Sequence, residues 1–244
     1  MDTSKLPPAE AAQGIFRERY EGARVLFLGG SVMRGEATPA SDLDVVVVYE
    51  RLPNAYREAF VYGGWPVEAF VHDAGTLEEF FEVDRRRGLP SLMSMVWEGS
   101  QVPGASEFSE GLRRRARELL DAGPPPWDEE ELTLRRYRLT DWVDDMRFPR
   151  SSEELVATGA WLYQDAAEFY FRTRGLWSAH SKTIPRRLRE ADAGFAERFL
   201  RAFDALFAEK RPDAAVALVA ELLEPFGGFL FEGFRKEAGK SREP

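Results

Sequence analysis

Two apolar runs, separated by a glycine-serine loop and a pair of aspartates, constrain the fold of this chain most. Val25–Leu28 and Val45–Val48 have the apolar composition of buried strands. Gly29-Gly30-Ser31 follows the first run, and Asp42-Leu43-Asp44 leads directly into the second. Because successive side chains of a strand point to opposite faces, we expect Asp42 and Asp44 on one face at the start of the second strand.

This arrangement predicts a site for a metal ion and a nucleotide at the edge of a sheet. Two adjacent carboxylates repel each other unless a cation lies between them, and oxygen ligands of this kind suit Mg²⁺ together with substrate phosphates. Gly29 and Gly30 allow a tight turn, and Ser31 at a helix start can offer its hydroxyl and amide to a phosphate. No Gly-Lys-Ser/Thr follows, so the loop is not a Walker P-loop. The alternative is a surface turn followed by two solvated acids.

The two halves of the motif together resemble the nucleotidyltransferase superfamily of the polymerase-beta type. The signature of that superfamily reads here as Leu28-Gly29-Gly30-Ser31, a spacer, and then Asp42-Leu43-Asp44-Val45. The resemblance implies that Asp42 and Asp44 hold the metal ions and that Gly30 and Ser31 seat the phosphates. It also implies a third carboxylate on a later strand, which binds metal or takes a proton from the attacking hydroxyl.

Glu68 is the predicted third carboxylate. It lies in Trp65–Val71, a β-like run after the Gly63-Gly64 turn, and shares a strand face with Phe70. A salt-bridged strand acid is the structural alternative for Glu68, and Asp73 is the fallback third acid. His72 and His180 are the only histidines in the sequence and no cysteine accompanies them, so the sequence offers no zinc cluster.

Gly123-Pro124-Pro125-Pro126 is the clearest boundary in the chain, because proline removes helical donors. We expect an α+β protein: a nucleotidyltransferase domain over residues 1–123, with a mixed β-sheet and flanking helices, followed by a helical bundle over residues 124–244. The elements expected in the first half are helices at 9–22, 31–34, 76–87 with Thr76 as N-cap, and 107–122, and strands at 25–28, 43–49, 60–62, 67–71 and 94–97. Those expected in the second half are helices at 127–146, 152–174, 193–209 and 213–224.

A mixed-sheet domain followed by a helical bundle resembles the aminoglycoside nucleotidyltransferases. In similar two-domain enzymes, a lysine after a glycine-containing loop between helices reaches the nucleotide phosphates. Lys182, which follows Gly175, is the matching residue here. The alternative for Lys182 is a solvated lysine near a helix start.

Several acids and aromatic residues of the helical half have two interpretations. A carboxylate cluster beside an aromatic ring could hold a polycationic sugar, but more often it is a solvated face paired with local arginines, here Arg138 and Arg147. Tryptophans in such a bundle are more often packing residues than ligand platforms. The residues concerned are Asp141, Asp144 and Asp145 beside Trp142, the pair Asp165 and Glu168, and Trp161 and Trp177.

Composition limits the expected cellular location of the protein and the kinds of molecule that it binds. The sequence contains no cysteine, no apolar run of membrane-span length and no signal-peptide hydrophobic region at its N-terminus, so we expect a cytoplasmic protein with no membrane partner. A net charge of −9 disfavours a nucleic-acid partner, although a local basic groove could override the total.

The expected function is Mg²⁺-dependent nucleotidyl transfer with two metal ions. A nucleoside monophosphate, AMP from ATP in the first instance or from another nucleoside triphosphate, would move onto a hydroxyl of a small molecule such as an aminoglycoside-like antibiotic, with release of pyrophosphate. Two alternatives stay open: transfer to a protein or RNA acceptor, and a non-catalytic protein that binds a nucleotide or a partner with the same fold.

Overall fold

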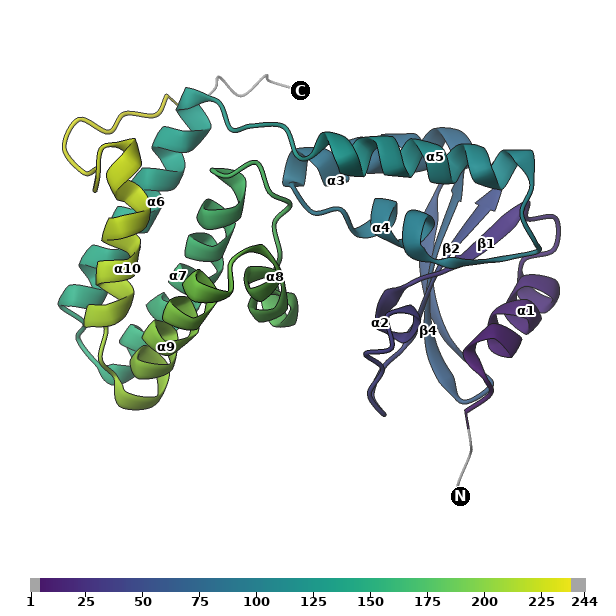
Figure 1. The fold of residues 1–244 in the computed structure, drawn as a ribbon, viewed down its shortest axis with the longest axis horizontal. Coiled ribbons are helices and arrows are strands. Elements are labelled where there is room, and N and C mark those ends of the chain that lie inside the picture. Colours follow the sequence, from purple (N-terminus) through teal and green to yellow (C-terminus); the bar gives the residue numbers. More distant parts are fainter. Residues whose placement is uncertain (1–4, 238–244) are drawn as a thin grey trace, which may run out of the picture. The chain divides into compact units, whose positions relative to one another are not determined.

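The computed structural model describes residues 5–237 and divides into two compact units after Pro124 (Figure 1). The first unit combines a mixed sheet with helices, and the second unit is helical. The predicted α+β class is therefore confirmed.

The sheet of the first unit has five strands in the order β3-β4-β2-β1-β5. β2 and β4 run parallel, whereas the pairs β1/β2, β1/β5 and β3/β4 are antiparallel. The strands are β1 (Val25–Leu28), β2 (Leu43–Tyr49), β3 (Tyr56–Tyr62), β4 (Trp65–Asp73) and β5 (Ser100–Val102). β2 and β4 lie inside the sheet, which explains their apolar composition, and β3 is an edge strand.

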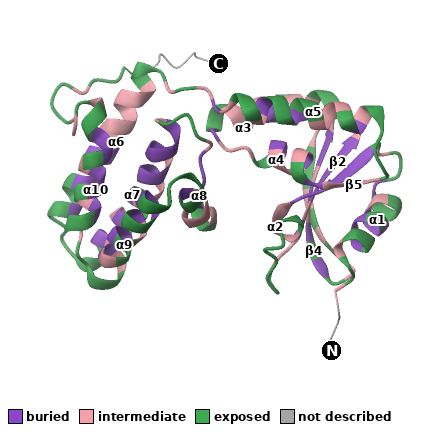
Figure 2. Cartoon of the chain, viewed as in Figure 1, coloured by how far each residue is buried: buried purple, intermediate pink, exposed green. Residues whose placement is uncertain are grey.

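Helices cover both faces of this sheet. The face that carries Leu43, Val45 and Val47 packs against α1 (Pro8–Arg19), whose Ala11, Ala12 and Ile15 are buried with it. Figure 1 shows α3 (Ala74–Arg87) and α5 (Glu107–Ala122) together on the other side of the sheet from α1, and Figure 2 shows that β2, which lies between them, is largely buried. The short helix α2 (Gly30–Met33) connects β1 to the loop before β2.

One predicted strand is wrong. Residues 94–97 belong to α4 (Ser91–Glu98), and the strand that follows is β5. Leu92, Met93 and Val96 are the buried residues of α4, and their i, i+1, i+4 spacing marks one face of a helix rather than alternate faces of a strand. Because the apolar run Met95–Trp97 is only three residues long, its periodicity was ambiguous in the sequence.

The N-cap of α3 also differs from the prediction. Asp73, not Thr76, caps the helix: the Asp73 carboxylate accepts hydrogen bonds from the backbone N–H of Thr76 at 2.8 Å and of Leu52 at 3.1 Å. The Thr76 side chain completes a capping box with the backbone N–H of Asp73. These hydrogen bonds, first that from Thr76, hold the pKa of the Asp73 carboxyl below its usual range.

The helical unit contains a single large core. The described part of this unit is built from α6 (Glu129–Arg147), α7 (Ser152–Arg172), α8 (Ile184–Ala191), α9 (Ala193–Glu209) and α10 (Asp213–Leu223), with short 3₁₀ turns at Ser181–Thr183 and Glu224–Phe226. The predicted helix at 193–209 is confirmed, as is 107–122 in the first unit, whereas α8 was not predicted. The Asp128 side chain caps α6 by accepting a hydrogen bond from the backbone N–H of Glu131.

The start of the helical unit is fixed by α7. Arg172 donates to the backbone carbonyl oxygen of Pro125 at 2.7 Å. The guanidinium groups of Arg172 and Arg135 lie 5.2 and 5.0 Å from the centroid of the Trp127 ring. Burial of Arg172 lowers its pKa. Trp127 is therefore a packing residue between two cations.

Among the described residues, no helix is both long and apolar enough to cross a membrane.

Replacing Asp73 by alanine should destabilise the first unit by about 1 kcal/mol, the usual cost of losing a helix N-cap. Folding lowers the pKa of Asp73, so its ionised carboxylate stabilises the folded state. This contribution to stability is complete above the unfolded pKa of about 3.9 and is lost as the pH falls through the folded pKa. Denaturant unfolding monitored at several pH values should show the largest difference from the wild type at pH 5 and above, and a shrinking difference below about pH 4. Asp73→Asn, which retains a capping oxygen, is the control. Equal losses in the two variants would exclude the cap as the cause.

Candidate metal and nucleotide site

The parallel pairing of β2 and β4 places two acids side by side. In this register Asp44 lies opposite Glu68, and both point to the sheet face away from α1. Asp42 immediately precedes β2 and reaches the same place. One carboxylate oxygen from each of Asp42, Asp44 and Glu68 lies within 4.8 Å of the other two, and all three residues are half-buried.

The donor set of this acid cluster (Asp42, Asp44 and Glu68) fits a hard divalent cation. Its ligand atoms are carboxylate oxygens, the type that Mg²⁺ prefers. Mg²⁺–O distances of about 2.0–2.1 Å place opposite ligand oxygens about 4.2 Å apart, so small side-chain rotations bring the cluster to bonding distance. Without a cation, three carboxylates this close repel one another. The residues present therefore fit a metal ion.

The glycine loop packs directly against the acid cluster. The backbone N–H of Gly29 donates to the carbonyl oxygen of Asp44 at 2.9 Å, which ties the loop to the start of β2. Gly30 has φ +76°, and a Cβ built on it would lie 2.2 Å from Oδ2 of Asp44. A side chain at position 30 would therefore both adopt a disfavoured backbone conformation and displace the Asp44 carboxylate.

The loop before Asp42 is held by contacts that the sequence did not reveal. The hydroxyl groups of Ser31 and Ser41 lie 3.4 Å apart, which links α2 to this loop. Lys5 donates to the carbonyl oxygens of Pro39 at 3.0 Å and Ser41 at 3.1 Å, and its ammonium lies 4.0 Å from the Trp65 ring centroid. The chain leading into Asp42 is thus attached to the segment before α1 and to the start of β4.

Arg57 of β3 is a second residue that the sequence analysis missed. Its guanidinium forms an ion pair with Oε2 of Glu68 and lies 4.9 Å from the centroid of the Phe70 ring. The signal was present in the Gly63-Gly64 turn. A two-residue turn pairs Tyr62 with Trp65, and counting back along the hairpin places Arg57 diagonally across from Glu68.

Asp73, the fallback third acid, has a structural role. In the β2/β4 register it pairs with Tyr49 at the far end of β2, whereas Glu68 pairs with Asp44 at its start. Its carboxylate accepts the α3 capping hydrogen bonds described above. Asp73 is not part of the acid cluster.

Lys182 belongs to the second unit, in the 3₁₀ turn before α8, and its side chain is exposed. Gln164 of α7 fixes the preceding segment: its side-chain amide donates to the carbonyl oxygen of Ala179 and accepts from the backbone N–H of Ser181, both at 3.1 Å. The turn that carries Lys182 is therefore anchored on α7.

The acids of α6 and α7 separate into paired and unpaired groups. Asp165 is 9% exposed and accepts hydrogen bonds from Arg138 and from the Trp142 indole N–H, both at 2.8 Å, and Asp144 pairs with Arg147. Asp141 has a pKa raised by burial and then by its neighbours Asp145 and Asp144. Asp165 and Asp144 therefore have structural partners. The charge of Asp141, by contrast, is opposed by burial and by its acidic neighbours.

Glu168 and the two tryptophans of this face also have packing contacts. Glu168 pairs with Arg135 at 2.8 Å, and burial raises its pKa despite that partner. Trp142 and Trp161 are stacked with ring centroids 6.3 Å apart; Trp142 packs against the core, whereas Trp161 is 58% exposed. Glu168 and Trp142 therefore have structural partners within the helical unit.

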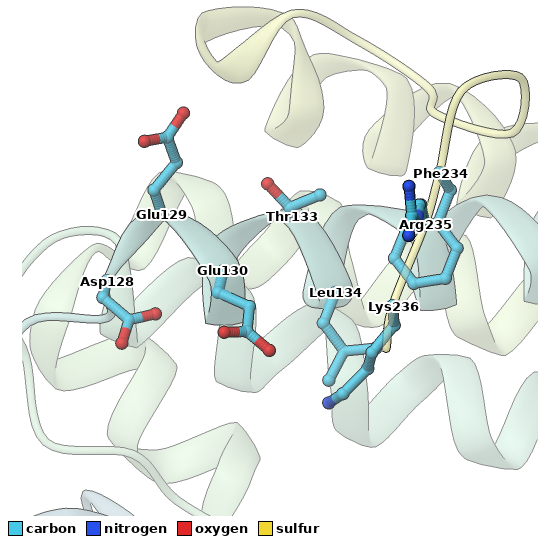
Figure 3. Close-up of a pocket in the computed structure, with 8 residues that line it drawn as sticks. All are labelled: Asp128, Glu129, Glu130, Thr133, Leu134, Phe234, Arg235 and Lys236. Carbon is cyan, nitrogen blue, oxygen red and sulfur yellow. The ribbon is translucent and has the colours of Figure 1, made fainter. Parts of the chain in front are cut away.

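A surface hollow of the helical unit lies outside all of these motifs (Figure 3). Carboxylates from the start of α6 line one part of it, and basic residues of the C-terminal segment line another. The ring of Phe234 stacks on Tyr137 at 3.9 Å between centroids, which holds that segment against α6. The lining residues are Asp128, Glu129, Glu130, Thr133, Leu134, Phe234, Arg235 and Lys236.

Comparison with known proteins identifies the first unit. Residues 10–88 match the model of the nucleotidyltransferase domain family, a stretch that contains the glycine loop and the acid cluster. The chain therefore carries a nucleotidyltransferase domain of the polymerase-beta-like superfamily, as the motif predicted. Among solved structures, a nucleotidyltransferase-like protein from Exiguobacterium sibiricum 255-15 is 14% identical, with a TM-score of 0.46 over 88% of this chain and 74% of that chain. No curated protein matches the sequence.

Gly30→Ala should impair metal binding without unfolding the domain, because its Cβ would displace the Asp44 carboxylate. The matched control is Gly35→Ala: Gly35 also has a positive φ, +71°, but a Cβ there meets nothing within 4 Å. Both variants should lose roughly 1–2 kcal/mol of stability from the left-handed backbone. Only Gly30→Ala should weaken Mn²⁺ binding, by about tenfold, which corresponds to 1.4 kcal/mol. Calorimetric titration of the two proteins measures this difference, and equal Mn²⁺ affinities would contradict the role assigned to Gly30.

Proposed function

We propose that this protein is a Mg²⁺-dependent nucleotidyltransferase that transfers a nucleoside monophosphate, AMP from ATP in the first instance, to a hydroxyl group of a small molecule. The observation that carries the proposal is the acid cluster, in which Asp42, Asp44 and Glu68 converge within 4.8 Å beside the glycine loop of a nucleotidyltransferase domain.

In this reaction the acceptor oxygen forms a bond to the α-phosphorus while the bond from that phosphorus to the bridging β-phosphate oxygen breaks, and pyrophosphate leaves. Asp42 and Asp44 would hold the metal ions, two in the complete site. When bound, Mg²⁺ neutralises charge on the phosphates and lowers the pKa of the acceptor hydroxyl. Glu68 would act as the third ligand or as the general base that takes the acceptor proton.

Gly30 and Ser31 are proposed to seat the phosphates. The positive φ of Gly30 and the absence of a side chain there permit close approach of the backbone to a ligand. The Ser31 hydroxyl, 3.4 Å from that of Ser41, lies in the first turn of α2, directly after Gly29 and Gly30, and the backbone N–H of Gly29 donates to the carbonyl oxygen of Asp44. A phosphate bound there would lie beside the metal ligands.

A small, neutral or cationic acceptor fits the charge of the protein best. The net charge of −9 opposes binding of a polyanion such as tRNA or DNA. Asp141, whose pKa is raised partly by Asp145 and Asp144, belongs to a surface of excess negative charge on α6. Both observations favour a cationic molecule such as an aminoglycoside-like antibiotic as the first acceptor to test.

Asp42→Asn and Asp44→Asn should each reduce nucleotidyl transfer by at least about a hundredfold, or about 2.7 kcal/mol in the barrier, because each removes a charged metal ligand. The assay incubates the protein with ATP, Mg²⁺ and a panel of aminoglycosides, lincosamides and related hydroxyl compounds, and detects the mass gain of the acceptor. Asp121→Asn, which removes an exposed acid of α5 paired with Arg117, is the control. Full activity of either Asp42→Asn or Asp44→Asn would refute the proposed function.

Lys182 is proposed to bind the nucleotide phosphates from the second unit. A charge-assisted contact of this type contributes roughly 1.5–3 kcal/mol, so Lys182→Ala should weaken ATP binding by about one to two orders of magnitude in the presence of Mg²⁺. The melting temperature without nucleotide should change little, because the side chain is exposed. Arg201→Ala, which removes an exposed cation of α9, is the comparison. An unchanged dissociation constant for ATP would remove Lys182 from the site.

A further inference from the structure

The ion pair between Arg57 and Glu68 is the contact of the acid cluster that the nucleotidyltransferase motif does not account for. We propose that Arg57 is a positioning residue for Glu68: it holds one carboxylate oxygen, limits what Glu68 offers a metal ion, and keeps the other oxygen available for the acceptor proton. This inference rests on the proposed function.

The β3/β4 hairpin creates the contact. Ala59 lies directly opposite Glu68, and Arg57 is two residues away on the same face of β3, opposite Phe70. The methyl group of Ala59 leaves space for the arginine side chain to extend diagonally to Glu68. A larger residue at position 59 would occupy the path of that side chain.

Phe70 restrains the guanidinium from a second direction. The Arg57 carbon Cζ lies 4.9 Å from the ring centroid of Phe70, which is within the range of a cation–π contact. The side chain of Arg57 is 59% exposed and that of Glu68 is 34% exposed, so the ion pair alone would contribute little to stability. Its importance lies in the orientation of Glu68, which two contacts of Arg57 help to fix.

The arrangement has opposite consequences for metal binding and for turnover. Arg57 competes with a cation for Oε2 of Glu68, so its removal should strengthen binding of a metal ion. Its removal also lets the Glu68 carboxylate rotate away from the position needed to accept a proton, and proton transfer depends strongly on that position. A residue that only stabilised the fold would not move these two quantities in opposite directions.

The test is a double-mutant cycle with Arg57→Ala, Glu68→Gln and the double variant, at physiological ionic strength. Mn²⁺ affinity is measured by calorimetry without nucleotide, and turnover is measured as pyrophosphate release from ATP with Mg²⁺ and the panel of hydroxyl acceptors named above. In the presence of Glu68, Arg57→Ala should raise Mn²⁺ affinity at least threefold and lower turnover about tenfold. In the Glu68→Gln background both effects should fall below twofold, because screening leaves little direct repulsion between an exposed arginine and the metal.

Arg19, the last residue of α1, provides a matched control because its ion-pair partner lies on the same hairpin. It forms an ion pair with Glu58 of β3, and its guanidinium lies 4.0 Å from the centroid of the Phe60 ring. Glu58 and Phe60 alternate with Ala59, so this pair lies on the opposite face of the sheet from the acid cluster. Arg19→Ala should leave both Mn²⁺ affinity and turnover within twofold of the wild type.

Three results would overturn the inference: Arg57→Ala behaves like Arg19→Ala, it changes both quantities by the same factor whether or not Glu68 is present, or it weakens Mn²⁺ binding. Failure of the proposed function is distinguishable. It would appear as the absence of pyrophosphate release in the wild type, or as release that survives Asp42→Asn, and the Mn²⁺ measurements would then decide the role of Arg57 alone.

Discussion

Mutual repulsion among three carboxylates is the constraint on which the first unit depends. The parallel pairing of β2 and β4 forces Asp44 and Glu68 into adjacent positions, and Asp42 joins them from the end of the preceding loop. Strand pairing, rather than any attraction between the side chains, holds these charges together. The energy released when a cation neutralises them is therefore available for binding a metal ion and its nucleotide.

The residues around the acid cluster hold its mutually repelling carboxylates in place. Gly29 binds the backbone of Asp44, Lys5 holds the carbonyl groups before Asp42, and Arg57 pairs with Glu68. Each acid is thus fixed by a different segment of the chain. Two of these three contacts come from cations, which reduce the excess negative charge of a cluster that would otherwise oppose folding.

The sequence predicted the elements whose periodicity is unambiguous. The strand at 43–49 and the helices at 107–122 and 193–209 are long and regular. The Gly-Gly-Ser and Asp-Leu-Asp motifs lie in the region that matches the model of the nucleotidyltransferase domain. The strand predicted at 94–97 was wrong because a short apolar run such as Met95–Trp97 fits a buried helix as well as a strand. Arg57 was missed for a related reason: β3 was predicted to begin at residue 60, so both Arg57 and Ala59, the residue opposite Glu68, lay outside the predicted strand. Contacts such as that of Lys5 with Ser41 depend on tertiary packing, which periodicity does not report.

The contact between Gly30 and Asp44 also bears on how this site could be lost in evolution. A Cβ at position 30 would lie 2.2 Å from Oδ2 of Asp44, so the geometry of the cluster depends on this glycine as well as on its ligands. A descendant of this domain could retain all three acids and still bind metal ions more weakly after one exchange at Gly30. Homologues of this domain should therefore be classified as active or inactive by the residue at this position as well as by the three acids. A homologue with all three acids but no glycine would otherwise be counted as active.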